Sequence, residues 1–165
     1  MKKITIKLLM ASLIMWPSIS VAATDARHIN VRMSPSVLLG FANARIDVKV
    51  HQNISAGIMV DYSMLVLKYY SYGLGLSFKL DGQDIMSTNG WYLNPYATYA
   101  YGRFKFDGDS TEKASNKTGG LIIGYQWIAK SGFNFRLGVG AQYNSSEVFG
   151  KKLLPDFSMT LGYAF

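Results

Sequence analysis

The clearest pattern in the chain is an alternation of apolar and small residues from Phe157 to Phe165. Every second residue is apolar or aromatic and those between are small or weakly polar: Phe157, Met159, Leu161, Tyr163 and Phe165 against Ser158, Thr160, Gly162 and Ala164. A period of two predicts a β-strand with one apolar and one compact face. At the edge of a soluble protein such a strand would invite aggregation. In a closed barrel within a bilayer, it pairs with the first strand and its apolar face meets lipid.

The same alternation recurs in five further segments, which are separated by polar, turn-rich stretches. These predicted strands are Ile54–Tyr62, Tyr70–Leu80, Trp91–Tyr101, Gly120–Trp127 and Phe133–Asn144. The last two are joined through Lys130-Ser131-Gly132, which reads as a hairpin turn. Pro95 does not fit its strand well, because proline lacks the N–H donor that a paired strand needs.

The remaining strands must come from Asn30–Val50, where the alternation changes phase around Gly40–Ala42. Apolar residues first fall on odd positions and then on even ones: Met33, Val37, Leu39 and Phe41, followed by Ala44, Ile46, Val48 and Val50. The change of phase indicates either a turn, which gives eight strands, or a bulge, which gives seven. Bacterial single-chain barrels have an even number of strands. We therefore predict an eight-stranded antiparallel up-and-down transmembrane β-barrel.

Eight strands place both chain ends on the periplasmic side and so assign the connections. Asp107–Asn116 and Ser145–Asp156 are expected to be long extracellular loops, and Lys130-Ser131-Gly132 a periplasmic turn. The stretch Asp81–Gly90 departs from this asymmetry, because it would be a long periplasmic connection. The sequence gives no physical reason for its length.

Residues 1–23 have the organisation of a secretory signal peptide. Lys2, Lys3 and Lys7 precede a short apolar run from Leu8 to Trp16, and Val21-Ala22-Ala23 offers small residues for cleavage. The alternative is an uncleaved anchor helix, but the apolar run is far shorter than the ~20 residues that such a helix needs. Cleavage after Ala23 would leave residues 24–165 as a single domain.

Composition narrows the function classes. The chain has no cysteine, which excludes disulfides and thiolate metal sites. Its formal charge of +7 falls to +4 when the three lysines of the signal are removed. That excess is too small to indicate nucleic-acid binding, and it is compatible with contact to anionic lipopolysaccharide. We expect a monomer.

An eight-stranded barrel has an interior just wide enough to be filled by side chains. The alternation turns a set of polar residues inward: Arg45, Asp47, Lys49, Asp61, Lys79, Gln126, Arg136 and Gln142. Because an unpaired buried charge costs several kcal/mol, opposite charges among them are expected to pair. We therefore predict a structural polar network that fills the lumen. A gated ion path or a small-ligand site is the alternative.

The candidate catalytic and metal-binding residues are few. His28 lies near the mature N-terminus and His51 heads a predicted turn, and neither has a serine and a carboxylate at a suitable spacing. Asp107-Gly108-Asp109 with Glu112 lacks the full spacing of a calcium loop. We predict no catalytic residues, no metal site and no cofactor.

The predicted outer loop from Ser145 to Asp156 carries the main candidate contact site. Lys151 and Lys152 lie between the apolar pairs Val148-Phe149 and Leu153-Leu154. The lysines would hold a lipopolysaccharide phosphate while the apolar residues touch acyl chains. The alternative is an ordinary solvated loop.

Two further stretches, Gly90–Tyr96 and Gly124–Trp127, resemble recurrent segments of small bacterial outer-membrane barrels of the outer membrane protein A and X type. The resemblance implies residence in the outer membrane of a Gram-negative cell, in contact with lipids and lipopolysaccharide. It implies that the assembly machinery reads the terminal strand through Tyr163 and Phe165. The function expected is non-enzymatic, structural or surface-interacting through outer loops; the alternatives are a narrow porin-like pore and a lipid A-modifying enzyme. No peptidoglycan-binding domain follows the barrel, so a cell-wall tether is not expected.

Overall fold

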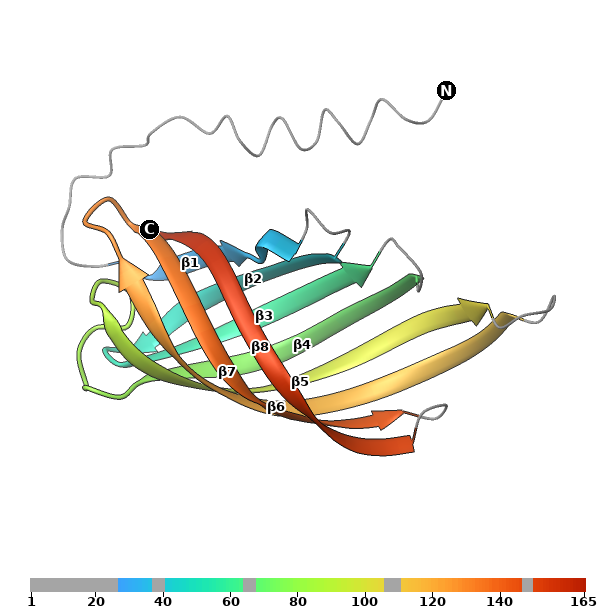
Figure 1. Ribbon diagram of the computed structural model, residues 1–165. Coiled ribbons are helices and arrows are strands. Elements are labelled where there is room, and N and C mark those ends of the chain that lie inside the picture. Colours follow the sequence, from blue (N-terminus) through green and yellow to red (C-terminus); the bar gives the residue numbers. More distant parts are fainter. Residues whose placement is uncertain (1–26, 37–40, 64–67, 106–110, 147–149) are drawn as a thin grey trace, which may run out of the picture.

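The computed structural model of the protein describes residues 27–36, 41–63, 68–105, 111–146 and 150–165. Its strands are β1 (Ile29–Met33), β2 (Phe41–His51), β3 (Ile54–Ser63), β4 (Lys68–Lys79), β5 (Gly90–Lys105), β6 (Thr111–Ile128), β7 (Phe133–Ser146) and β8 (Gly150–Ala164). All neighbouring strands are antiparallel, and β1 pairs with both β2 and β8, so the sheet closes (Figure 1). The predicted eight-stranded up-and-down barrel is confirmed. Within the described ranges, no helix is long and apolar enough to span a membrane.

The N-terminal part settles the choice between a turn and a bulge. β1 ends at Met33 and β2 begins at Phe41, so this stretch forms two strands, as predicted. The backbone N–H of Ser34 donates to the carbonyl of Asn43 at 3.0 Å, just beyond the paired part of β1. Val37 and Leu39 lie outside the described residues, as does the predicted signal peptide, whose cleavage after Ala23 stays a prediction.

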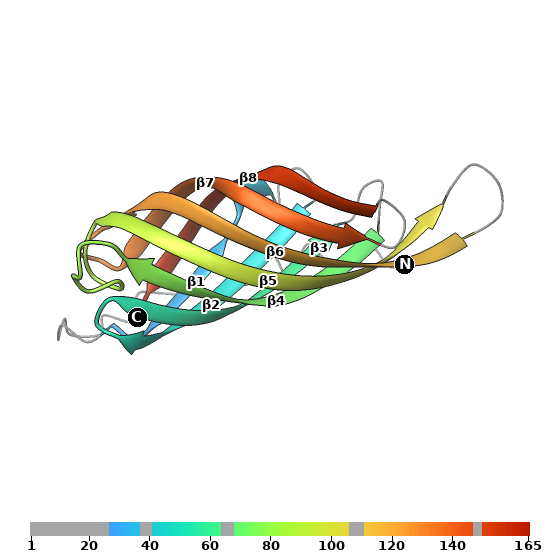
Figure 2. The same cartoon turned by 90° about the horizontal axis from the view of Figure 1, so that it is seen from below.

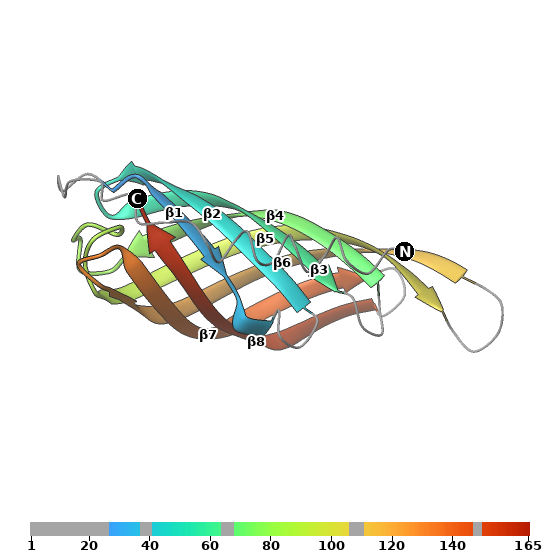
Figure 3. The same cartoon turned by 90° about the horizontal axis from the view of Figure 1, so that it is seen from above.

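The two ends of the barrel are named by what lies at them: the terminal end has the first and last described residues, and the loop end is opposite. The terminal end holds His28 and Phe165, together with the connections 52–53, 80–89 and 129–132. The loop end is the opposite one, where β3 ends at Ser63 and β7 ends at Ser146. Figure 1 shows the C-terminus and the connection between β4 and β5 at the terminal end, and Figures 2 and 3 show β5 and β6 reaching farthest beyond the loop end.

The strands at the loop end are longer than the sequence indicates. β5 continues to Lys105 and β6 starts at Thr111, and β7 and β8 are paired as far as Ser146 and Gly150. The predicted loops Asp107–Asn116 and Ser145–Asp156 are therefore wrong over most of their length. Polar residues in a strand that extends past an apolar belt carry no alternation of hydrophobicity, and this hides the strand from the sequence pattern.

The outer surface carries an aliphatic band between two aromatic belts. Exposed residues of the band include Ile46, Val48, Ile58, Val60, Leu74, Leu121, Ile123, Leu137 and Val139. Tyr62, Tyr70, Tyr72, Tyr99 and Tyr101 lie toward the loop end, and Trp91, Trp127, Phe133, Tyr163 and Phe165 toward the terminal end. Neighbouring rings pack together, with centroids 4.8 Å apart for Tyr62 and Tyr70 and 5.3 Å apart for Trp127 and Phe135. This is the surface of a membrane-spanning barrel.

The structure explains how Pro95 is tolerated in β5. The pairing of β4 with β5 is interrupted where Leu76 and Ser77 face Asn94 and Pro95, and it resumes on both sides without a shift of register. The side-chain amide of Asn94 donates to the carbonyl of Leu76 at this interruption. A neighbouring side chain thus supplies a donor that proline cannot provide.

Candidate functional site in the barrel lumen

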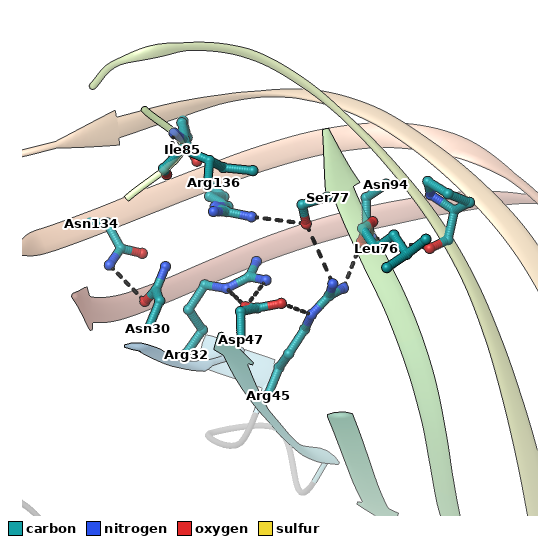
Figure 4. A network of polar contacts seen from close by, with 12 residues as sticks. Asn30, Arg32, Arg45, Asp47, Leu76, Ser77, Ile85, Asn94, Asn134 and Arg136 are labelled. Carbon is teal, nitrogen blue, oxygen red and sulfur yellow. Dashed lines mark hydrogen bonds and ion pairs between the residues drawn. The ribbon is translucent and has the colours of Figure 1, made fainter. Parts of the chain in front are cut away.

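A cluster of charged residues crosses the lumen in its terminal half. Asp47 of β2 accepts hydrogen bonds from two arginines: Nε of Arg32 lies 2.9 Å from Oδ2, and Nε of Arg45 lies 2.7 Å from Oδ1. Arg45 also donates to Oδ1 of Asn94 on β5, at 2.6 Å. Figure 4 shows Arg32 and Arg45 on either side of Asp47. All four side chains are buried.

Arg136 of β7 approaches the same cluster from the other side of the lumen (Figure 4). Its Nη1 lies 3.4 Å from Oγ of Ser77, which is also 3.4 Å from Nη2 of Arg45. The guanidinium carbon is 5.1 Å from the ring centroid of Tyr92, a cation–π contact. Arg136 is 0% exposed, and its Nε and Nη2 have no hydrogen-bond partner among the described residues.

Interior glycines make room for the cluster. A Cβ at Gly57 would lie 2.2 Å from Oδ1 of Asp47, the residue with which Gly57 is paired across β2 and β3. A Cβ at Gly124 would lie 2.7 Å from the hydroxyl of Tyr92. Large polar side chains fit inside this narrow barrel because the neighbouring strands carry glycine opposite them.

The long connection between β4 and β5 folds back into the terminal end of the barrel and plugs it. Ile85 and Met86 are both 0% exposed, and the N–H of Ile85 donates to the carbonyl of Gln52 at 2.9 Å. From inside the barrel, Nε2 of Gln126 donates to the carbonyls of Ile85 and Thr88, each at 2.9 Å. We call residues 80–89 the plug. Its length, which the sequence left unexplained, lets the segment reach Gln52 and Gln126 and bury these two apolar side chains.

Two lysines from the barrel wall hold the plug. Nζ of Lys49 lies 2.7 Å from Oδ2 of Asp84, and Nζ of Lys79 donates to the carbonyl of Asn89 at 2.7 Å and to that of Thr88 at 3.1 Å. The polar residues predicted to form one interior network therefore form two separate groups. Lys49, Lys79 and Gln126 bind the plug, whereas Arg45, Asp47 and Arg136 form the central cluster.

The loop half of the lumen contains a cavity of about 710 Å³. Its floor is formed by Arg32, Arg45, Tyr92 and Asn94, and its walls reach Asn116 and Lys152 near the loop end. The prediction that side chains fill the interior along its whole length is wrong for this half. Small wall residues such as Ala42, Ser71, Thr98 and Ser158 leave the space.

Several polar side chains around this cavity form hydrogen bonds with side chains of the adjacent strand in the wall. The amide of Asn43 donates to Asp61 on the neighbouring strand, and Oγ1 of Thr118 lies 2.6 Å from Oδ1 of Asn144. Asp61, predicted to pair with a cation, thus has an amide partner instead. The Tyr96 hydroxyl of β5 contacts strands that are not adjacent to its own. It lies 2.5 Å from Oδ2 of Asp156 on β8 and 3.1 Å from Oε1 of Gln142 on β7.

The two lysines of the predicted lipopolysaccharide site lie on opposite faces of β8. Lys152 lines the cavity with Leu154 and Asp156, which share its parity. Lys151 has the parity of Leu153 and Phe157, both exposed on the outer surface. The structure does not place them on one face of the strand, and their contact with lipopolysaccharide stays a prediction. Lys151 and Leu153 remain together at the outer rim, while Val148 and Phe149 lie outside the described residues.

The histidines are both exposed at the terminal end. Nδ1 of His51 lies 2.8 Å from Oδ1 of Asn53, so its partner there is an amide rather than a carboxylate. Asp107, Gly108 and Asp109 lie outside the described residues, and within the described part of the chain no group of acidic residues and histidines is placed to hold a metal ion.

The terminal strand closes the barrel by pairing Leu161–Ala164 with β1, and Phe165 extends this pairing. The carbonyl of Phe165 accepts hydrogen bonds from the N–H of His28 at 2.7 Å and from that of Ile29 at 3.3 Å. The rings of Tyr163 and Phe165 pack together with their centroids 4.8 Å apart, and both are exposed on the terminal aromatic belt. Their use as an assembly signal stays a prediction.

Sequence reasoning missed several members of the central cluster: Arg32, Ser77, Tyr92 and Asn94. The parity of Met33, which is outward, places Arg32 inward and was sufficient to find it. Tyr92 and Asn94 also have inward parity, but neither carries a charge that singles it out. The plug gave no signal beyond its length, because its two buried apolar residues, Ile85 and Met86, lie in a polar segment.

No family model matches the chain, and no curated protein matches its sequence. Among solved structures it is similar to the N-terminal β-barrel domain of Pseudomonas aeruginosa OprF, with a TM-score of 0.61 and 8% sequence identity. The match covers 84% of this chain and 96% of that domain. The similarity confirms the eight-stranded barrel fold, and the identity is too low to carry a function from one protein to the other.

Proposed function

We propose that the protein is an outer-membrane barrel that is closed on its periplasmic side and presents a cavity to the cell exterior. The observation that carries this proposal is the plug: two fully buried apolar residues, Ile85 and Met86, close the terminal end below a cavity that reaches the loop end. The role is structural or surface-interacting and involves no catalysis.

The outer surface supports a location in a bilayer, because the aliphatic band between two aromatic belts matches a membrane-spanning barrel. Up-and-down outer-membrane barrels have both termini in the periplasm, which makes the plugged end periplasmic. Lys151 and Leu153 then lie at the outer rim, where a basic and an apolar side chain suit lipopolysaccharide. Tyr163 and Phe165 would be presented to the assembly machinery at the inner rim.

The plug is tested by replacing it with a tight turn. Leu80 and Trp91 already pair, since the N–H of Leu80 donates to the carbonyl of Trp91 at 3.0 Å. Replacing residues 81–90, which are the plug without Leu80 and with Gly90 added, by Asn-Gly should therefore join β4 to β5 as a two-residue hairpin. In planar bilayers, the natural protein should show no steady openings and the hairpin variant should conduct.

An Asp84→Asn variant is the matched control, because it weakens the contact with Lys49 and keeps the plug in place. It should stay closed or open only briefly. Steady openings of the natural protein would instead support a narrow pore, the second candidate, which the cavity of about 710 Å³ favours. A closed hairpin variant would show that the plug is not the seal.

A further inference from the structure

We propose that the floor of the cavity is a binding site for an oxyanion, a carboxylate or phosphate group carried by a small molecule. The site consists of Arg32 and Arg45, which line the floor, with Arg136 behind them. The inference concerns binding and does not depend on whether the plug blocks conduction.

The charge balance of the central cluster calls for an anion. Three guanidinium groups, those of Arg32, Arg45 and Arg136, face a single carboxylate, that of Asp47, which leaves a net charge of +2 among buried side chains. The remaining partners, Ser77 and Asn94, are neutral. Uncompensated charge in a low-dielectric interior is unfavourable, and neutral hydrogen-bond acceptors do not cancel it.

The hydrogen-bond donors point to the same conclusion. Oγ1 of Thr160, on the cavity wall, is buried without a partner among the described residues. Nε and Nη2 of Arg136, which lies behind the floor and does not line the cavity, are in the same state. Buried donors of this kind are rare in folded proteins unless water or a ligand satisfies them. Guanidinium groups match carboxylate and phosphate oxygens in geometry as well as in charge.

The cavity above the floor sets the size of the ligand. A volume of about 710 Å³ lies within the range of pockets for small organic molecules. The two carboxylates on its walls, Asp61 and Asp156, are held by Asn43 and Tyr96, and Lys152 lies nearer the loop end. A ligand with its anionic group on the floor and an uncharged polar body toward the loop end fits this distribution.

The test is calorimetric titration of the refolded full-length mature chain in zwitterionic detergent, where both ends of the barrel are in solution. The probes are inorganic phosphate, benzoate and, as an uncharged analogue of benzoate, benzyl alcohol. Phosphate or benzoate should bind, and the one that binds more tightly identifies the preferred anionic group. Equal binding of benzoate and benzyl alcohol would overturn the proposal.

A charge-removing variant at the floor and a matched control elsewhere separate a charge-based site from an unspecific one. Arg45→Gln should weaken binding by about tenfold or more, since it removes a charged donor from the floor. Arg27→Gln is the matched control: it removes the same charge, but at the terminal end, where Arg27 donates to the carbonyl of Ala129. It should leave the affinity unchanged.

Asp47→Asn should strengthen binding several-fold, because it raises the net charge of the cluster from +2 to +3 and weakens competition for Arg32 and Arg45. Because a bound ligand stabilises the folded state, phosphate should also raise the unfolding midpoint of this variant more than that of the natural protein. The heat-modifiable gel shift reports which variants fold. No binding to the natural protein, or an affinity unchanged by both Arg45→Gln and Asp47→Asn, would refute the site.

Discussion

The two halves of the lumen are built from the same strands and yet hold their polar residues in different ways. In the terminal half, side chains from opposite walls meet: Arg45 of β2 contacts Asn94 of β5, and Arg136 of β7 contacts Ser77 of β4. In the loop half, most contacts run along the wall, as between Asn43 and Asp61, and a cavity of about 710 Å³ remains.

The difference shows how a narrow barrel can be sealed and still contain a usable space. Long charged side chains reach across the terminal half only because glycines such as Gly57 stand opposite them. The plug then covers the cluster from below, with Ile85 and Met86 shielding it from the solvent at that end. The loop half keeps short side chains on its walls and leaves its space to water or a ligand.

The largest difference between the halves should appear when a carboxylate is removed from each. Asp47→Asn leaves three buried arginines without their counter-charge and should lower the free energy of unfolding by about 3–5 kcal/mol. The matched variant, Asp61→Asn in the loop half, weakens hydrogen bonds with neutral side chains only, those of Asn43 and Ser71, and should cost about 1 kcal/mol.

Urea unfolding of the refolded proteins in lipid vesicles measures both changes, with tryptophan fluorescence as the signal. The measurement is made without phosphate or other oxyanions, so that ligand binding does not mask the effect. Similar losses for the two aspartates would contradict the view that only the terminal half depends on paired charges.

The outer surface should not share the contrast between the halves, because lipid contact there depends on depth alone. Leu137, within the aliphatic band, is 47% exposed on the outer face, and Leu153 is exposed near the loop end. Leu137→Arg should destabilise the barrel folded in vesicles by about 2–4 kcal/mol, and Leu153→Arg should destabilise it by about 0–1 kcal/mol. Equal effects would show that the aliphatic band is not at the centre of the bilayer.

The sequence predicts the outside of this protein better than its inside, and the reason is physical. Lipid-facing positions such as Leu121 and Ile123 repeat with a period of two, so alternation reveals the strands, and the even number of strands in bacterial barrels then gives eight. Partners inside the lumen are set by the tilt and stagger of the barrel, which bring Arg136 to Ser77 across the sheet. Alternation also fails beyond the membrane, where β6 begins at Thr111 in a polar segment.

A moderate loss of stability should follow when a larger side chain fills the space beside the charged cluster of the terminal half. Gly57→Val would place a side chain within contact of Oδ1 of Asp47 and should destabilise the barrel by about 1–3 kcal/mol through overpacking. Gly119 is the matched control, since a Cβ there would meet no atom within 4 Å. Gly119→Ala should change the unfolding free energy by less than about 0.5 kcal/mol. A harmless Gly57→Val would mean that Asp47 can rearrange freely.

The smallest effect is expected at Tyr96, where the loop half comes closest to resembling the terminal half. Its hydroxyl lies 2.5 Å from Oδ2 of Asp156 across the cavity, from β5 to β8. Tyr96→Phe removes this contact, but Asp156 lines the cavity and is only half-buried, so water replaces the lost donor. The free energy of unfolding should fall by only about 0.5–1.5 kcal/mol. A loss as large as that of Asp47→Asn in the same urea titration would show that Tyr96 and Asp156 brace the loop half, and that the two halves of the lumen follow one principle after all.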